Sequence, residues 1–140
     1  MMHRKHFISS LGYSVAAVCT GCLAACVKSD SVTGGAPPTG VNISIDLTTQ
    51  LLNIGDSLIS GGLIIVRLAA TNVPASFTAL QLACTHQGIS VDYNKSLTEF
   101  VCPLHGATFA TSGAVVQGPA TKALKQYTIT INNTTMTVTD

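Results

Sequence analysis

Residues 84–106, CTHQGISVDYNKSLTEFVCPLHG, decide how this 140-residue chain is interpreted. The stretch holds a Cys84-x-His86 pair and, fifteen residues later, a Cys102-x-x-His105 pair. Thiolate and imidazole are soft ligands for transition metals. Two such pairs at the ends of one short segment therefore predict a metal site.

Both pairs are expected in loops at one end of a sheet. The first follows a predicted strand at 77–83, the second follows one at 97–101, and a strand at 89–93 connects them. Loops on adjacent hairpins can converge. In an extended backbone, residues two apart point the same way, so Cys84 and His86 would face one site.

The residues beside the pairs suit tight loops. Gly88 and Gly106 follow the two histidines, and glycine permits the backbone conformations that such turns need. Pro103 stiffens the second loop. Backbone N–H groups can then lie close to the sulfur atoms, where hydrogen bonds tune a metal centre.

The rest of the domain is predicted to be all β. Residues 41–47 alternate apolar and polar side chains, and 63–70 form an apolar run rich in β-branched residues. Residues 127–131 and 134–139 indicate a hairpin. Turn signals recur at 53–56, 61–62, 72–74, 92–95 and 112–113. Without convincing helical periodicity, this pattern favours a sandwich or barrel of short strands.

The N-terminus has the layout of an export signal. A short basic segment precedes the uncharged apolar run 7–25, which ends in Leu23-Ala24-Ala25-Cys26. That ending resembles the lipobox of bacterial lipoproteins, which implies a signal peptide at 1–25 and a lipid on Cys26. An uncleaved membrane anchor is the alternative. Residues 26–40 would then be the lipidated cysteine and a flexible tether, followed by the domain at 41–140.

Processing would leave only Cys84, Cys102, His86 and His105 as uncapped soft ligands. The formal charge would change from +1 to −1, from five basic and six acidic residues. Because there is no basic patch and aromatic residues are few, we expect no nucleic-acid partner.

The whole motif resembles the ligand set of Rieske [2Fe–2S] proteins, in which two histidines replace two cysteines on one iron. The resemblance implies that Cys84 and Cys102 bind one iron and that His86 and His105 bind the other. Gly118-Pro119-Ala120 is similar to the family's loop that covers the cluster. The likeness extends over about residues 50–138 and implies an antiparallel β-sandwich with a cluster-binding subdomain inserted around 83–110.

Departures from the respiratory members of that family are informative. Ile89 and Leu104 stand where those proteins carry two further cysteines that form a disulfide. This chain therefore lacks that disulfide, and in this respect it resembles Rieske-type ferredoxins. Ala107 and Phe109 stand where they place a serine and a tyrosine hydroxyl near the cluster. Fewer donors to the reduced cluster predict a potential in the lower part of a range of about −150 to +300 mV.

The sequence thus predicts one-electron transfer by a membrane-tethered carrier or small redox subunit rather than a stand-alone enzyme. We expect redox partner proteins and export to a bacterial membrane facing the periplasm or exterior. A zinc-binding structural lipoprotein is the alternative, although Cys-x-His spacing is unusual for zinc. A Cys84–Cys102 disulfide and a ferredoxin that feeds an oxygenase are further possibilities.

Overall fold

The computed structural model describes residues 35–140, which form an almost entirely β structure. The strands and the single 3-10 turn of this part are β1 (Asn42–Asp46), β2 (Ser57–Ser60), β3 (Leu63–Arg67), η1 (Pro74–Ser76), β4 (Phe77–Gln81), β5 (Asp92–Asn94), β6 (Glu99–Val101), β7 (Thr108–Ala110), β8 (Val115–Gln117), β9 (Thr128–Asn132) and β10 (Thr135–Thr139). All pairings are antiparallel, which confirms the expected fold class.

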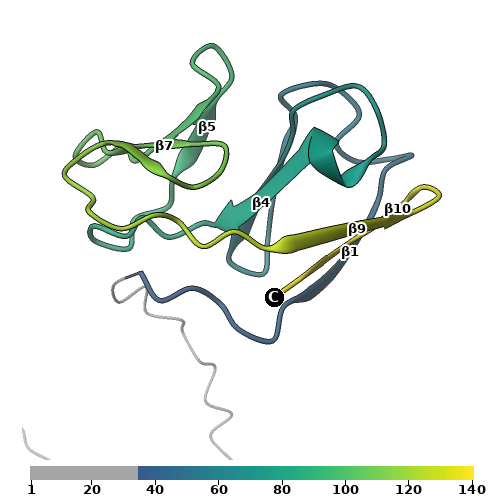
Figure 1. Cartoon of the computed structure of the whole chain (residues 1–140), viewed down its shortest axis with the longest axis horizontal. Coiled ribbons are helices and arrows are strands. Elements are labelled where there is room, and N and C mark those ends of the chain that lie inside the picture. Colours follow the sequence, from purple (N-terminus) through teal and green to yellow (C-terminus); the bar gives the residue numbers. More distant parts are fainter. Residues whose placement is uncertain (1–34) are drawn as a thin grey trace, which may run out of the picture.

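Two three-stranded sheets, β1-β10-β9 and β2-β3-β4, pack around one core (Figure 1). Every residue of β3 and β4 is buried, and for β3 this agrees with the apolar run at 63–70. β10 alternates instead, burying Met136 and Val138. The sheets therefore supply Ile65 and Phe77 on one side of this core and Met136 and Val138 on the other.

The third sheet, β5-β6-β7-β8, is inserted between β4 and β9. It packs with residues of β3 and β4 around a second core, in which Phe100 and Phe109 pair across β6 and β7 and the two cysteines are buried. Since β8 belongs to this sheet, the inserted subdomain extends beyond the expected limit at residue 110.

One expected turn is displaced. Residues 92–94 form β5 rather than the turn predicted at 92–95, and the chain reverses after them. The Asn94 side chain accepts hydrogen bonds from the backbone N–H groups of Ser96 and Leu97. An asparagine that bonds the backbone two residues on favours a turn that starts there.

Residues 35–40, called the strap below, run along the domain. The Gln81 side chain donates to the carbonyl of Gly35 (3.2 Å), and the Tyr127 hydroxyl donates to that of Pro38 (2.8 Å). The predicted signal segment, Cys26 and residues 27–34 lie outside the described residues. Between residues 35 and 140, no helix has the length and hydropathy needed to cross a bilayer.

Candidate metal centre

The first Cys-His pair lies in a tight loop between β4 and β5. The N–H of Cys84 donates to the carbonyl of Ile89 (2.8 Å), and the N–H of Gly88 donates to the carbonyl of Cys84 (2.7 Å). Gly88 has a φ of 76°, in the left-handed region that glycine adopts without strain. The loop is thus closed by its own backbone.

The second pair lies in a loop of the same form between β6 and β7. Here the N–H of Cys102 donates to Ala107 (2.8 Å), and the N–H of Gly106, at φ 71°, donates to Cys102 (3.0 Å). Each loop therefore runs from its cysteine to a left-handed glycine four residues later. The histidine occupies the third position of the first loop and the fourth position of the second.

The two loops bring their thiols together in the core of the inserted subdomain. Cys84 is fully buried, Cys102 is 2% exposed, and both are free thiols. Burial raises the pKa of the Cys84 thiol. The backbone N–H groups of His86 and Gln87 lower that pKa, and the adjacent Cys102 thiol raises it. These N–H groups would stabilise a thiolate.

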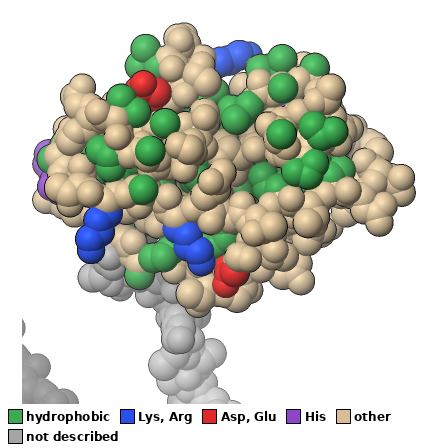
Figure 2. Space-filling model, in the orientation of Figure 1, with side chains coloured by type: hydrophobic (Ala, Val, Ile, Leu, Met, Phe, Trp, Pro, Cys, Tyr) green, Lys and Arg blue, Asp and Glu red, His purple; other side chains and the backbone are tan. Residues whose placement is uncertain are grey.

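The two imidazoles form a second pair at the surface. The ring centroids of His86 and His105 are 5.0 Å apart, and the rings meet edge to face at 72°. His86 is half-buried and His105 is exposed, so histidine is visible at one edge of the molecule in Figure 2.

The surroundings of the His86 Nδ1 atom indicate whether this site suits a metal. It is buried and has no hydrogen-bond partner in the described part of the chain. A buried polar atom without a partner is costly, and a metal ion would satisfy it. Sequence reasoning proposed this ring as a ligand, and its unsatisfied nitrogen fits that role.

The four side chains are arranged as two like pairs, thiol with thiol and imidazole with imidazole. Among residues 35–140, no three or more His, Cys, Asp or Glu side chains surround one common point. A tetrahedral zinc site needs its ligands around a single ion. The two pairs suit a centre with two metal ions, one bound by sulfur and one by nitrogen.

The remaining predicted site residues surround the two loops. Pro103 is exposed at the tip of the second loop. Gly118 and Pro119 are joined by a cis peptide, and the following Ala120 is buried in the same core as the cysteines. Ala120 therefore ties the end of this segment to the core that holds the thiols, and the role of Gly118 and Pro119 as a covering loop stays a prediction.

Sequence reasoning missed two residues that hold the first loop. Thr85 donates its hydroxyl to the carbonyl of Lys122 (2.6 Å). Gln81, 2% exposed, donates to Ala83 (2.7 Å) and accepts from the N–H of Lys125 (3.0 Å). An amide side chain in the apolar run before Cys84 was the available signal, since a buried amide needs hydrogen-bond partners.

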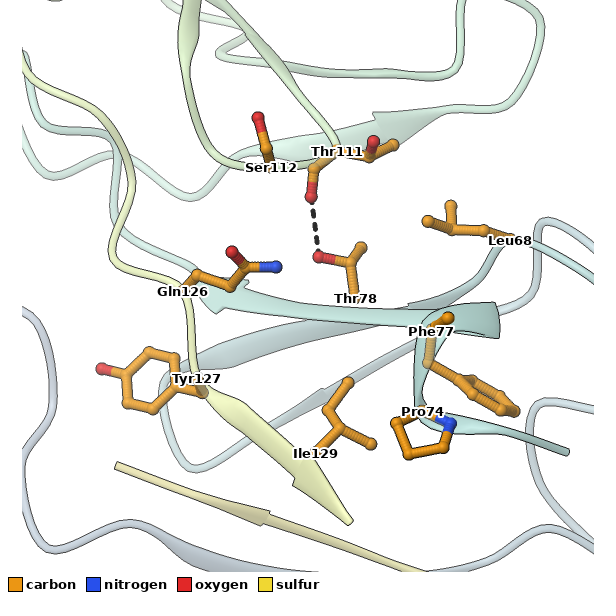
Figure 3. Close-up of a pocket in the computed structure, with 10 residues that line it drawn as sticks. Leu68, Pro74, Phe77, Thr78, Thr111, Ser112, Gln126, Tyr127 and Ile129 are labelled. Atoms are coloured by element: carbon orange, nitrogen blue, oxygen red, sulfur yellow. Dashed lines mark hydrogen bonds between the residues drawn. The ribbon is translucent and has the colours of Figure 1, made fainter. Parts of the chain in front are cut away.

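A separate hollow of about 340 Å³ lies away from these loops (Figure 3). It is bounded by η1, β4, β9 and the turn after β7, where the Thr78 hydroxyl donates to the Thr111 carbonyl (2.7 Å). Its lining contains no Cys, His, Lys, Arg, Asp or Glu. It therefore lacks the groups of a metal site.

Comparison with known proteins identifies the family. The family model of the Rieske [2Fe-2S] domain matches residues 55–128, which include both ligand loops. This chain belongs to the Rieske [2Fe–2S] domain family. Its cofactor is accordingly a [2Fe–2S] cluster, a centre that serves electron transfer.

The relatives of this Rieske chain include subunits of larger assemblies. It is 30% identical over 139 residues to the cytochrome b6-f complex iron-sulfur subunit 1 of Trichormus variabilis, covering 88% of this chain and 76% of that one. The corresponding subunit of Chlorobaculum tepidum is 33% identical over 67 residues, 48% of this chain and 37% of that protein. The match thus spans little more than a third of the latter.

Among solved structures, this Rieske chain is similar to the cyanobacterial plasma membrane Rieske protein from Synechocystis. The TM-score is 0.56 at 25% identity, covering 70% of this chain and 99% of that structure. Both comparisons place the chain among Rieske electron carriers.

Proposed function

We propose that this protein is a lipid-anchored, one-electron carrier or small redox subunit on the outer side of a bacterial membrane. Cys84 and Cys102 bind one iron of its cluster, and His86 and His105 bind the other. The lipid is on Cys26, after removal of residues 1–25, and residues 26–40 connect it to the domain at 41–140.

The observation that carries this proposal is the segregation of the four side chains. The buried thiols adjoin each other, and the imidazoles lie 5.0 Å apart with His86 Nδ1 unpartnered among the described residues. A bound [2Fe–2S] cluster supplies a one-electron couple at this place.

The chain's own residues prepare the site for electron transfer. The core around Cys84 and Cys102 keeps water from the sulfur side. The backbone N–H groups of His86 and Gln87 point toward sulfur, where they favour negative charge. On the other side, the exposed His105 gives a partner protein a short route to the site. Gly88, Gly106, Pro103, Gly118 and Pro119 support the two loops.

Relatives support a redox partner and a membrane setting. The names of similar proteins denote subunits of cytochrome b6-f complexes and a plasma membrane Rieske protein. By analogy, the donor or acceptor here is another redox protein at the membrane.

Spectroscopy of the anaerobically purified full chain tests the cluster. We expect two irons and two sulfides per chain, and a rhombic EPR signal after dithionite reduction with an average g below that of all-cysteine [2Fe–2S] proteins. Zinc in place of iron would instead support a structural metal-binding lipoprotein.

Variants of the second loop test two of the four ligand assignments. Cys102→Ser and His105→Ala should both abolish the rhombic signal. Leu104→Ala lies between them in the same exposed loop and should retain it. Loss of signal in all three variants would mean that the loop, rather than its ligands, is what these changes disturb.

Mass spectrometry tests the anchor. The mature N-terminus should be Cys26 carrying a lipid, and Cys26→Ser should remain unprocessed. An N-terminus before residue 26 in the wild type would refute the anchor but not the electron-transfer role.

A further inference from the structure

The strap is fixed to the domain at both ends. Beyond the bonds from Gln81 and Tyr127, the N–H groups of Gly40 and Val41 donate to the Asp140 carboxylate at 2.7 and 3.2 Å. Its composition, rich in Gly and Pro, predicts a flexible linker. These long-range bonds instead give the chain a defined path along one face.

The strap begins against the first ligand loop. A methyl group added to Gly35 would lie 3.3 Å from the carbonyl oxygen of Cys84 and 3.6 Å from the Cα of Thr85. Figure 1 shows the described chain starting beneath the loops of the inserted subdomain. Any N-terminal extension therefore leaves the domain at the end that carries the ligands.

The sequence limits how far that end can be from an anchor. Eight residues, 27–34, separate Cys26 from Gly35. Even fully extended, this connection spans at most about 30 Å. A domain of this size has a diameter of similar magnitude. With a lipid on Cys26, the ligand end would lie within about one domain diameter of the bilayer, and tether length alone does not choose which face lies on it.

Two of the three lysines in residues 35–140 lie on the strap face. A hollow of about 560 Å³ is lined by residues 35–37 of the strap, by Thr85 and by Lys122 and Lys125. The other cations in residues 35–140 are elsewhere: Arg67 is buried, and Lys95 packs on Gly55. Asp140 lies 3.8 Å from the Lys125 ammonium and offsets part of its charge. Figure 2 shows basic side chains, with an acidic one beside them, on the lower side of the molecule.

We propose that the strap face, made of residues 35–40, Lys122 and Lys125, rests on the anionic lipid headgroups of the membrane that holds the anchor. The inference rests on the lipid anchor of the proposed function. Basic side chains beside a membrane attachment are attracted to anionic lipids. This contact keeps the ligand end at the bilayer surface while His86 and His105 face sideways, toward a partner in the same membrane.

The test uses the full, cluster-containing chain in vesicles that carry a gadolinium-chelating lipid. Relaxation of the reduced cluster's EPR signal reports its distance from the headgroups. We expect several-fold faster relaxation in vesicles with phosphatidylglycerol than in vesicles of phosphatidylcholine alone. Lys122→Gln/Lys125→Gln should remove that difference, whereas Lys95→Gln, the same change on another face, should preserve it.

Flotation of the same vesicles separates the ways in which the inference can fail. If the protein floats with both lipids but relaxes equally in them, the anchor stands and the strap face does not bind headgroups. The strap face is likewise excluded as the headgroup contact if Lys95→Gln abolishes the difference as well. If the wild type does not float with either vesicle, the anchor is refuted, and this inference with it.

Discussion

At the scale of single residues, exposure rises from sulfur to nitrogen across the site. Cys84 and Cys102 are buried, His86 is half-buried and His105 is exposed. The two loops have the same hydrogen bonds, but histidine occupies different positions in them, which accounts for the different exposure of the two rings. A cluster held here has a dry side and a side accessible to partners.

Ala107 offers a single-residue test of cluster tuning. Its side chain is fully buried, and its carbonyl accepts from the N–H of Cys102. Ala107→Ser should raise the reduction potential, because a hydroxyl donor stabilises the more negative, reduced cluster. One hydrogen bond is worth about 1 kcal/mol, or about 40 mV for a one-electron couple.

A redox titration followed by EPR measures that shift. The control is Ala110→Ser, at the end of β7 and half-buried, which should leave the potential unchanged. An unchanged or lower potential in Ala107→Ser would contradict the role assigned to missing donors.

At the scale of elements, Gly113 lies in the turn between β7 and β8 and contacts the segment that leads to β9. Its φ is 84°, and a Cβ there would lie 2.5 Å from the carbonyl oxygen of Leu124. Gly113→Ala should therefore lower the free energy of unfolding by about 2–4 kcal/mol. Chemical denaturation measures the loss.

Gly40→Ala separates the cost of the left-handed backbone conformation from the cost of the close contact with Leu124. Gly40 has a similar φ of 68°, but no atom lies within 4 Å of its Cβ position. It should therefore cost only the left-handed backbone term, about 1 kcal/mol. Equal losses in the two variants would show that the contact with Leu124 contributes nothing.

The turn after β1 gives an acid-dependent contribution. The Asp46 carboxylate accepts from the N–H and the hydroxyl of Thr48, at 2.8 and 2.7 Å. These bonds, the N–H first, lower the pKa of Asp46 below its ordinary value of 3.8. Its contribution is thus fully present above pH 3.8 and is lost as pH falls through the lowered pKa.

Asp46→Asn should accordingly be less stable than wild type at neutral pH, with the two converging at low pH. Thermal unfolding between about pH 2 and pH 7 measures both curves. Thr48→Ala keeps the backbone N–H that donates to Asp46 but removes the hydroxyl, so it should lose only part of the pH-dependent stability. A stability difference between Asp46→Asn and wild type that stays constant with pH would contradict this account.

Local patterns predicted β1, β3, β4 and the β9–β10 hairpin, because alternation and apolar runs report which face is buried. They misplaced β5, whose Asp and Asn suggest a turn, and they ended the inserted subdomain at residue 110 before β8. The four candidate ligands followed from their spacing. The ordered path of the strap could not be predicted from the sequence. Its hydrogen-bond partners Gln81 and Tyr127 are distant in the sequence, and composition does not reveal them.

At the scale of the whole molecule, Gln81 joins three segments of the chain: the strap, the first ligand loop and the segment that returns to β9. Its buried amide bonds the strap at Gly35, the first ligand loop at Ala83 and the return segment at Lys125. Gln81→Leu keeps the side-chain volume but leaves these backbone groups without their partner. Because each unsatisfied buried group costs about 1–3 kcal/mol, we expect a net loss of about 2–4 kcal/mol. Gln117→Leu, exposed on β8, should change stability by less than about 0.5 kcal/mol.

A second measurement shows whether Gln81 holds the strap and the ligand loop together or acts only as an ordinary core residue. Under conditions where Gln81→Leu remains folded, amide exchange should accelerate in the strap and around Thr85 but not in β10, to which Gln81 makes no hydrogen bond. Since the strap then no longer fixes the ligand loop, the EPR signal of the reduced cluster should also broaden. A uniform rise in exchange across the domain, with an unchanged EPR signal, would reduce Gln81 to a contributor to global stability. It would also show that the ligand loop is independent of the strap.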